Sequence, residues 1–359
     1  MAEPIRIGFI GAGAIITRGH IPNFQRQSGV ALAAICDTNL VRAQEAAAAA
    51  GIPNAYSDYR ELCASPDVDA VVIGVPNAFH APAAIAALEH GKHVLCEKPL
   101  ATSVADGEQM VALAQQKGLV LAVNMSNRPR AEYVAIQQFI AAGHLGKPTF
   151  AFGRMMRRSG IPGYGSWFTR KELAGGGATM DIGVHVLDMV MWALGFPEIT
   201  SVRGEVVAVH GPRELGLGGW GMDRVPGGTF DVDDYAAIHA RMAGGGLVTV
   251  EVSWALHGRN EERIQIAGDQ GGVDFFPDRY GVEQPLRFFR YEDGVAVEII
   301  PTLPHTDAAT VWGIGIGKFL TAVRGDGKPV ADGADGLKVL RLLDATYRSA
   351  IEGRELSLG

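Results

Sequence analysis

Two stretches of the sequence carry side chains that could move a proton. The first, Gly91-Lys-His-Val-Leu-Cys-Glu97-Lys98-Pro99, reads as a strand that ends in an acid, a lysine and a proline. Ligands bind at the carboxyl ends of strands in open parallel sheets, and Pro99 restricts the backbone of Lys98 toward extended conformations. We therefore expect Lys98 at the edge of a binding crevice, although a lone lysine at a strand end is ordinarily a solvated surface residue.

The second stretch is Gly175-Gly-Gly-Ala-Thr-Met-Asp181-Ile-Gly-Val-His185-Val-Leu-Asp188, which runs into an apolar helical segment. Asp181 and His185 are four residues apart, so both are expected to project from one face of one helical turn. A carboxylate beside an imidazole can fix the orientation of the ring and raise its basicity, as a general base requires. For an isolated Asp-x-x-x-His, the alternatives are an ordinary ion pair and a structural core histidine.

A glycine loop near the start predicts a dinucleotide site. The segment Gly8-Phe-Ile-Gly11-Ala-Gly13-Ala-Ile-Ile16 follows an apolar run and opens a helical pattern. Gly11 would permit the tight turn, Gly13 would let the backbone approach a pyrophosphate, and the helix start around Ala14 and Ile15 would offer free N–H groups. The third position of the usual fingerprint is Ile16 rather than Gly or Ala, so the strand before the loop and the helix after it carry the prediction.

Asp37 stands where the second apolar run ends. An acid there can accept hydrogen bonds from the adenosine ribose hydroxyls and would repel a 2′-phosphate. Thr38 and Asn39 follow, so no arginine comes directly after it. We therefore favour NAD, without excluding NADP. The alternative is a turn residue or a helix cap.

These residues need a scaffold, and hydrophobic periodicity predicts one of the α/β class. Short apolar runs alternate with helical patterns, which indicates a doubly wound Rossmann sheet of parallel strands. The expected strands are 5–10, 30–36, 70–75, 93–96 and 119–123, and the expected helices are 14–27, 39–50, 81–89 and 103–117. We assign residues 1–125 to an NAD(P)-binding Rossmann domain.

The pattern changes after Asn124 to runs of strands, which predicts an α+β domain on a largely antiparallel sheet. Glycine turns at 244–246 and 271–272 are expected to separate several strands. The expected strands are 149–156, 199–210, 235–241, 247–254 and 263–267, after a helix at 130–142 and before helices at 308–323 and 335–351. We assign residues 126–359 to a substrate-binding and oligomerisation domain.

Composition narrows the class of protein further. The chain has 359 residues, 47% of them hydrophobic, with a formal charge of -7 and no dense basic run, so nucleic acid is not an expected partner. We expect no membrane association, because no apolar run is long enough to span one and no secretory leader is visible. Three scattered cysteines fit a reducing cytoplasm. No metal site is expected, because no Cys or His pair has metal-ligand spacing.

Taken in order and spacing, these motifs resemble the glucose–fructose oxidoreductase/inositol dehydrogenase (Gfo/Idh/MocA) family over nearly the whole chain. The resemblance includes the glycine loop, Val75-Pro-Asn77-x-x-His80, Glu97-Lys98-Pro99 and the glycine-triplet helix of Asp181 and His185. It extends to the closing segment Ala345-Thr-Tyr-Arg-Ser-Ala-Ile-Glu-Gly353.

The resemblance implies a catalytic set of Lys98, Asp181 and His185. His185 would take the hydroxyl proton, while Lys98 would bind the reacting oxygen, stabilise its developing negative charge and relay protons with Asp181. It also implies a second group around the cofactor, namely Val75, Pro76, Asn77, His80, Glu97 and Lys98. Asn77 could instead cap the next helix. The candidates for substrate contact are Asn124, Arg128, Tyr164 and Trp167.

The expected function is hydride transfer between NAD and a secondary alcohol or ketone of a sugar, inositol or sugar derivative. An NAD-using glycosidase on the same fold and a non-catalytic cofactor-binding regulator are the alternatives. The presence of Lys98, Asp181 and His185 together disfavours the regulator. Relatives often pair through the second-domain sheet, so a homodimer or homotetramer is expected. Trp254, His257 and His305 could contact substrate, although structural roles are the simpler interpretation.

Overall fold

A computed structural model describes residues 3–221, 224–277 and 286–358. Its internal contacts divide the chain into two compact units, the first made of Met1–Pro129 with Asp307–Leu340 and the second of Arg130–Thr306 with Arg341–Gly359. The sequence suggested a single boundary at residue 125. It did not predict that Asp307–Leu340 belongs to the first unit.

The first unit is built on a six-stranded sheet in the order β3-β2-β1-β4-β5-β6, with every neighbouring pair parallel. Its strands are β1 (Ile5–Ile10), β2 (Val30–Cys36), β3 (Asn54–Tyr56), β4 (Ala70–Ile73), β5 (His93–Cys96) and β6 (Leu121–Val123). This is the strand order of the doubly wound dinucleotide-binding fold, in which the order reverses between β1 and β4.

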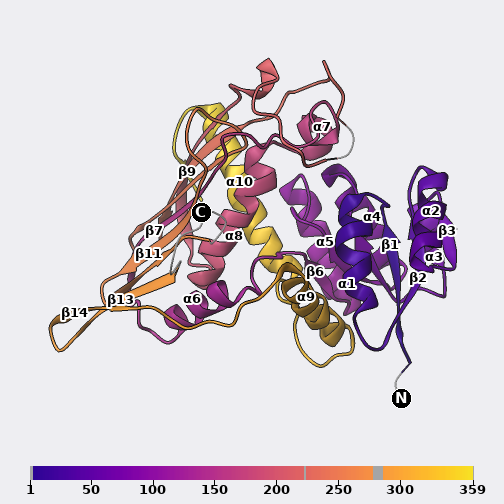
Figure 1. Ribbon diagram of the computed structural model, residues 1–359, viewed down its shortest axis with the longest axis horizontal. Coiled ribbons are helices and arrows are strands. Elements are labelled where there is room, and N and C mark those ends of the chain that lie inside the picture. Colours follow the sequence, from indigo (N-terminus) through magenta and orange to yellow (C-terminus); the bar gives the residue numbers. More distant parts are fainter. Residues whose placement is uncertain (1–2, 222–223, 278–285, 359) are drawn as a thin grey trace. The chain divides into compact units, whose positions relative to one another are not determined.

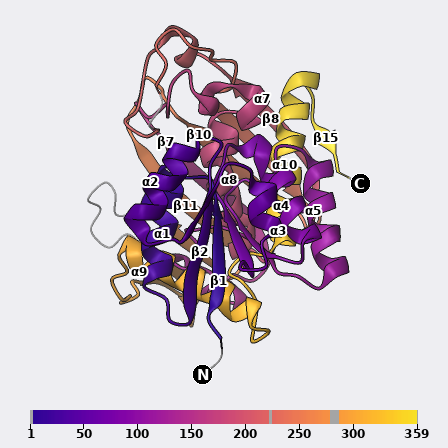
Figure 2. The same ribbon diagram turned by 90° about the vertical axis from the view of Figure 1, so that its right-hand side faces the viewer.

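Helices cover both faces of this sheet, with α1, α2 and α9 on one side and α3, α4 and α5 on the other (Figure 2). Their bounds are η1 (Ile15–His20, a π-helix), α1 (Ile21–Gln25), α2 (Leu40–Ala50), α3 (Tyr59–Ala64), η2 (Asn77–Phe79, a 3₁₀ turn), α4 (His80–Glu89), α5 (Val104–Lys117) and α9 (Ala308–Val323). Helix α10 (Gly333–Glu352) crosses from the first unit into the second. Asn39 caps α2 and Ser103 caps α5, each accepting a backbone N–H three residues on.

Helix α9 belongs to the first unit because it completes that unit's core. Ile316, Phe319 and Leu320 pack in one buried cluster with Phe9 of β1 and Phe24 of α1. Burial of large apolar side chains is the main stabilising term in folding. Residues near the end of the chain therefore stabilise the sheet that the first residues begin.

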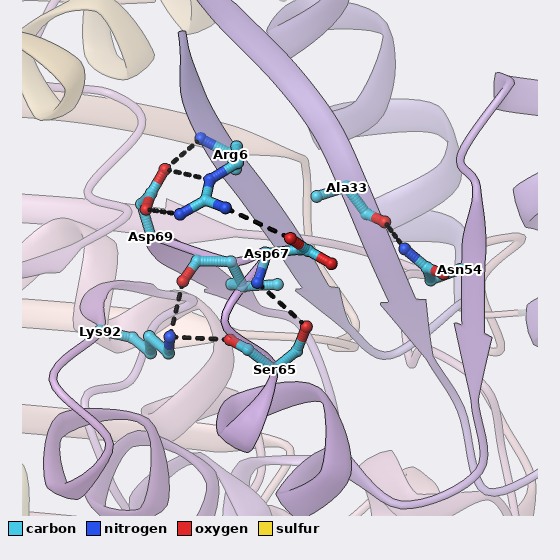
Figure 3. A network of polar contacts seen from close by, with 8 residues as sticks. Arg6, Ala33, Asn54, Ser65, Asp67, Asp69 and Lys92 are labelled. Carbon is cyan, nitrogen blue, oxygen red and sulfur yellow. Dashed lines mark hydrogen bonds and ion pairs between the residues drawn. The ribbon is translucent and has the colours of Figure 1, made fainter. Parts of the chain in front are cut away.

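A polar network ties the strands together at the end of the sheet where β1 begins (Figure 3). The Arg6 guanidinium donates to both oxygens of Asp69, at 3.0 and 2.7 Å, and its backbone N–H donates to Asp69 at 2.8 Å. The hydrogen bond from Arg6 is the largest cause that lowers the pKa of Asp69. Lys92 Nζ donates to the carbonyls of Ser65 and Val68 at 2.9 and 2.7 Å. These contacts stabilise the end of the sheet opposite to the glycine loop.

The second unit is built on a nine-stranded sheet in the order β14-β13-β12-β11-β7-β10-β9-β8-β15, where β7 and β10 are parallel and the other neighbours antiparallel. The strands are β7 (Pro148–Met156), β8 (Ile199–Val207), β9 (Tyr235–Met242), β10 (Leu247–Ser253), β11 (Glu261–Gly268), β12 (Gly271–Phe275), β13 (Leu286–Glu292), β14 (Val295–Ile299) and β15 (Leu356–Ser357). The predicted α/β class, with a parallel sheet followed by a largely antiparallel one, is confirmed.

Helices α6 and α8 lie against one face of this sheet (Figure 1). The helical elements of the unit are α6 (Ala131–Ala141), η3 (Trp167–Thr169), α7 (Lys171–Ala174), η4 (Thr179–Gly183, a π-helix), α8 (Val184–Ala193) and η5 (Gly211–Arg213). One expected turn was wrong. Gly271 and Gly272 lie in strand β12, where they pair with Arg290 and Phe289 of β13.

Candidate active site

The glycine loop lies at the carboxyl end of β1, where the strand order of the first sheet reverses. Gly11 has φ +102°, a conformation that favours glycine. A Cβ on Gly11 would stand 2.5 Å from the carbonyl oxygen of Gly74, which follows β4. A Cβ on Gly13 would meet no atom within 4 Å. The loop is therefore closed on the β4 side and open at Gly13, which is the space that a pyrophosphate on the helix start requires.

The helix after the loop explains how Ile16 replaces the third glycine of the fingerprint. That glycine ordinarily allows close packing of helix and strand. Ile16 is fully buried, and an ideal Cβ on Gly74 would lie 2.8 Å from its Cγ1 and Cδ1 atoms. The missing side chain at Gly74 makes the room that Ile16 occupies. Ala14 and Ile15 stand at the first turn of η1 and are half-buried.

Asp37 follows β2 and holds the glycine loop directly. Its Oδ2 accepts the backbone N–H of Ala12 at 3.0 Å, and its Oδ1 accepts that of Asn39 at 2.9 Å. A carboxylate has about four lone-pair sites, so both oxygens can accept further bonds. The Arg42 guanidinium lies 3.9 Å from Oδ2. Sequence reasoning noted that no arginine followed Asp37 directly and missed Arg42, which helix α2 brings back to it.

Glu97 is buried at the end of β5 and shares one oxygen between two side chains. His20 Nε2 lies 2.8 Å and Asn124 Nδ2 2.7 Å from Oε1, while the backbone N–H of Lys98 donates to Oε2 at 3.3 Å. Burial acts to raise the pKa of Glu97, but the contacts with His20 and Asn124 and the charge of Lys98 together hold it below its ordinary value. The Glu97 carboxylate thus fixes the backbone that presents Lys98.

Lys98 is the one residue between Val94 and Ala101 that is not buried. Next to it, the buried His80 ring lies between two backbone carbonyls, with Nδ1 2.7 Å from Pro99 O and Nε2 3.0 Å from Val75 O. Burial lowers the pKa of His80, and a neutral imidazole donates through one nitrogen only. His80 therefore joins the segment after β4 to the segment after β5.

Pro76 precedes η2, and Asn77 is buried as the first residue of that turn. Val75 and Pro76 are half-buried. The segment from Val75 to Asn77 follows β4, and Lys98 follows β5. The carboxyl ends of these neighbouring strands are where ligands of such sheets bind.

In the second unit, Asp181 and His185 are the two residues between Gly176 and Met191 that are not buried. Asp181 lies in the π-helical turn η4 and His185 in the first turn of α8. The sequence predicted a regular helix here. A π turn carries one more residue than an α turn, and such turns are frequent at functional sites.

Each of the three glycines before this helix is required for a different reason. Gly175 ends α7 with φ +78°. A Cβ on Gly176 would stand 1.9 Å from the hydroxyl of Tyr347, and one on Gly177 would stand 1.8 Å from the carbonyl oxygen of Asp233. The triplet therefore brings the start of the helix against α10 and the segment before β9.

The buried Asp233 carboxylate anchors that start with four bonds. It accepts the N–H groups of Gly177 and Thr179 at 2.7 and 2.8 Å, and the Thr179 and Tyr347 hydroxyls at 2.7 Å each. Burial, followed by the charge of Asp233, raises the pKa of Tyr347 well above its ordinary value. Tyr347 therefore stays protonated and donates its hydrogen bond.

Trp254 follows β10 and is fully buried. Its indole Nε1–H donates to Asp181 Oδ2 at 2.8 Å. Trp254 therefore contacts a candidate catalytic side chain.

The sequence contained no indication of Gly74, His20 and Asp233, because long-range contacts leave no local pattern. The pairing of adjacent acids, Asp233 and Asp234, just before a strand was the one available signal.

The candidates for substrate contact differ in how they are placed. Arg128 is 1% exposed and donates to Asp335 at 2.7 Å and to the Val330 carbonyl at 2.9 Å, so its charge is held within the first unit. Tyr164 is buried and stacks on Phe230. Trp167 is half-buried against Phe168, and Asn124 is committed to Glu97. Trp167 therefore has the most accessible ring of the set.

Within residues 3–221, 224–277 and 286–358, no three His, Cys, Asp or Glu side chains gather as metal ligands would. In the same described ranges, no helix is long and apolar enough to cross a membrane.

The Rossmann strand order and the open glycine loop define the first unit as a dinucleotide-binding fold. Residues 5–125 match the model of an oxidoreductase family with an NAD-binding Rossmann fold, and residues 133–274 match the GFO/IDH/MocA C-terminal domain. The chain belongs to the Gfo/Idh/MocA family of oxidoreductases, which confirms the resemblance and the prediction of an NAD-binding oxidoreductase.

Several of the relatives are named as sugar dehydrogenases. The chain is 29% identical over 361 residues to D-glucoside 3-dehydrogenase of Escherichia coli (strain K12), covering 99% of this chain and 98% of that protein. It is 31% identical to levoglucosan dehydrogenase of Pseudarthrobacter phenanthrenivorans, covering 88% and 86%. A solved levoglucosan dehydrogenase in complex with NADH and L-sorbose superimposes with a TM-score of 0.84 at 26% identity, covering 100% of both chains.

Proposed function

We propose that this oxidoreductase transfers hydride between NAD and a secondary alcohol or ketone of a sugar, inositol or sugar derivative. The observation that carries the proposal is the selective accessibility of three side chains. Lys98 stands out from buried neighbours after β5, and Asp181 and His185 stand out from the otherwise buried run Gly176–Met191. The named activities of the relatives support the sugar substrate.

In this proposal the three side chains act on the same substrate molecule. His185 accepts the hydroxyl proton of the alcohol, which a neutral imidazole can do near neutral pH. Lys98 donates to the same oxygen and stabilises its developing negative charge, and Asp181 exchanges protons with the pair. Bound NAD supplies the hydride acceptor, and for reduction each proton step runs in reverse.

The proposed cofactor contacts follow the glycine loop and the ends of β2, β4 and β5. The N–H groups of Gly13, Ala14 and Ile15, at the start of η1, would bind the pyrophosphate, because the first N–H groups of a helix have no acceptor within it. Those of Ile16 and Thr17 bond to the carbonyl of Gly13 at 3.1 and 3.0 Å. The set comprises Gly11, Gly13, Ala14, Ile15, Ile16, Asp37, Val75, Pro76, Asn77, His80, Glu97 and Lys98. Of these, Ile16, His80 and Glu97 are buried and support the site through packing and backbone contacts. Asp37 supports the preference for NAD through its negative charge.

We propose Trp167 as a stacking surface for the sugar and Asn124 as a support of Glu97. Tyr164 and Arg128 drop out of the set because both are buried in other contacts.

A homodimer or homotetramer is part of the proposal, formed through the open face of the second sheet. Phe150, Phe152 and Arg154 alternate with buried residues along β7 and remain half-buried, which suits a partly apolar interface. Three free, buried cysteines are compatible with a cytoplasmic location.

The test is the reduction of NAD and NADP, followed by absorbance, across inositols, aldoses, glucosides, anhydrosugars and sugar acids. We expect turnover of at least one compound, and a loss of kcat of roughly 10²-fold or more in His185→Gln and Lys98→Met, the usual range for a group that transfers a proton. His239→Gln and Lys318→Met, at exposed positions, are the matched controls.

Undiminished turnover in His185→Gln and Lys98→Met would contradict the catalytic roles. Release of free sugar without net change in the cofactor would indicate the glycosidase alternative. NAD binding by calorimetry without any turnover, together with full biological activity of both variants, would indicate a regulator.

A further inference from the structure

Trp254 holds an unusual position for an aromatic core residue. It follows the last residue of β10, and its backbone N–H donates to the carbonyl of Asp234 at 2.8 Å. The whole side chain is buried. A buried indole N–H nearly always finds a hydrogen-bond acceptor, and here that acceptor is the ionisable side chain of Asp181, at 2.8 Å from Oδ2.

Both ends of this contact are held in place by adjacent acids. Asp233 fixes the start of the Asp181 helix through Gly177 and Thr179. The Asp234 carboxylate accepts the backbone N–H groups of residues 209–211, at 2.6 to 3.1 Å, so the carbonyl that holds Trp254 belongs to a firmly bonded segment. The indole N–H and the carboxylate oxygen therefore meet in one defined geometry.

We propose that Trp254 is a positioning residue, which favours the ionised form of the Asp181 carboxylate and holds it in a single orientation. A hydrogen bond donated to a carboxylate stabilises the charged form over the neutral one, and bonds to charged acceptors are stronger than neutral ones. With Oδ2 held by Trp254, the carboxylate cannot rotate freely, and Oδ1 is presented in a fixed direction. The assignment rests on the proposed function only in calling Asp181 catalytic.

The contact can be read without any turnover, through the indole N–H signals of the five tryptophans in ¹⁵N-labelled protein. Trp254→Phe identifies the Trp254 signal by its absence. We expect this signal to move with pH in the wild type, as Asp181 takes up a proton, and to lose that movement in Asp181→Asn. The other titratable groups on the elements packed around η4 include His185 and Asp188 of α8, Tyr235, His239 and Arg241 of β9, Glu251 of β10, and Asp233 and Tyr347 beside the glycine triplet. A pH response caused by any of them would persist in Asp181→Asn.

A Trp254 signal that does not respond to pH, or that responds equally in Asp181→Asn, would overturn the proposal. The pH titration itself keeps Trp254 in place. Where Trp254→Phe folds poorly, Phe substitutions of the other four tryptophans, one at a time, identify the Trp254 signal by elimination. The titration also separates the two proposals, because failure to turn over any substrate would leave the coupling of Trp254 and Asp181 measurable.

Kinetics give the second readout. In Trp254→Phe we expect kcat to fall about tenfold, the loss that corresponds to one hydrogen bond to a charged group, with KM changed less than threefold. The acidic limb of the kcat/KM profile should move to higher pH, because the charged form of Asp181 loses a hydrogen bond that favours it. Phe275→Leu is the matched control, because it removes core volume from the same sheet at another buried site. A pH profile that Phe275→Leu moves as far as Trp254→Phe does would reduce Trp254 to a packing role.

Discussion

Asp37 shows how one side chain serves the loop and the cofactor together. It holds the Ala12 N–H and lies 3.9 Å from the Arg42 guanidinium. Asp37→Asn keeps an oxygen for Ala12 and removes the charge that opposes a 2′-phosphate, while Arg42 becomes available to that phosphate. We expect kcat/KM for NADP to rise by roughly tenfold or more, which is about 1.4 kcal/mol, and that for NAD to fall.

The second variant needed for that test is Asp37→Asn with Arg42→Ala, in which the gain with NADP should disappear. Arg42→Ala alone is the control for helix α2. An equal response of NAD and NADP to Asp37→Asn would show that the carboxylate acts only on the loop.

The lowered pKa of Glu97 predicts how the free energy of unfolding depends on pH. Its pKa is lowered in the folded protein from the ordinary 4.5, so its ionised form stabilises the fold above pH 4.5, and this contribution is lost as the pH falls through the lower folded value. Glu97→Gln should reduce the free energy of unfolding by about 2 kcal/mol at pH 7, as for a buried bond to a charged group. Urea unfolding at several pH values should show the difference from wild type closing below pH 4.5.

The control for Glu97→Gln is Glu45→Gln on the exposed side of α2, which should leave stability unchanged at every pH. A gap between wild type and Glu97→Gln that stays constant from pH 7 to 3 would mean that the amide loses packing rather than charge.

At the scale of elements, the helix after the glycine loop and the helix that carries Asp181 and His185 both begin with a π turn. In η1 the N–H of Ile21 bonds to the carbonyl of Ile16, and in η4 the N–H of Val184 bonds to that of Thr179. Each is a five-residue step, one longer than in an α-helix. The wider turn changes which side chains face the site, and a sequence pattern with a period of 3.6 residues cannot reveal it.

The packing of η1 on β4 can be tested at Gly74. A methyl group there would stand 2.8 Å from Ile16, and overpacking of this kind costs about 1–3 kcal/mol. We expect Gly74→Ala to lower stability and to weaken NAD binding in calorimetry. In Ile16→Ala with Gly74→Ala the two contacts with Ile16 are relieved and only that with Ile15 Cγ2, at 2.9 Å, remains. The double variant should therefore be more stable than the sum of the single losses by about 1 kcal/mol. Strict additivity would mean that the two positions do not share this space.

Elements with strong local signals could be predicted from the sequence, and those defined by long-range contacts could not. Strands β2 and β5 and helix α9 have the bounds that apolar runs and caps indicated. Strands β13 and β14 were missed because neither is an apolar run: β13 carries three charged residues among seven, and β14 is short and has no buried residue. At the site, local motifs marked Lys98, Asp181 and His185. The partners that hold their neighbourhoods, His20 for Glu97 and Trp254 for Asp181, lie 77 and 73 residues away and become evident only when the chain is folded.

At the scale of the whole molecule, the first unit depends on residues from near the end of the chain. Phe319 of α9 is buried in the core under the parallel sheet. Phe319→Ala should cost about 3–5 kcal/mol and weaken NAD binding, although it lies far outside residues 1–125. Phe139→Ala in α6 of the second unit is the matched control, which should destabilise the protein and leave NAD affinity intact. Equal NAD affinity in both variants would place the cofactor fold in residues 1–129 alone.

Because Asp307–Leu340 belongs to the first unit, the order of synthesis decides when that unit can complete its core. As the ribosome releases the first strands, the sheet has its glycine loop and its parallel order but still lacks Ile316, Phe319 and Leu320. At about 5–20 residues per second, roughly 10 to 40 s pass between the release of Pro129 and that of Leu340. During this interval the apolar surface beneath α1 is open to solvent and to chaperones. The nascent protein should therefore acquire affinity for its dinucleotide only after Leu340 has left the ribosome.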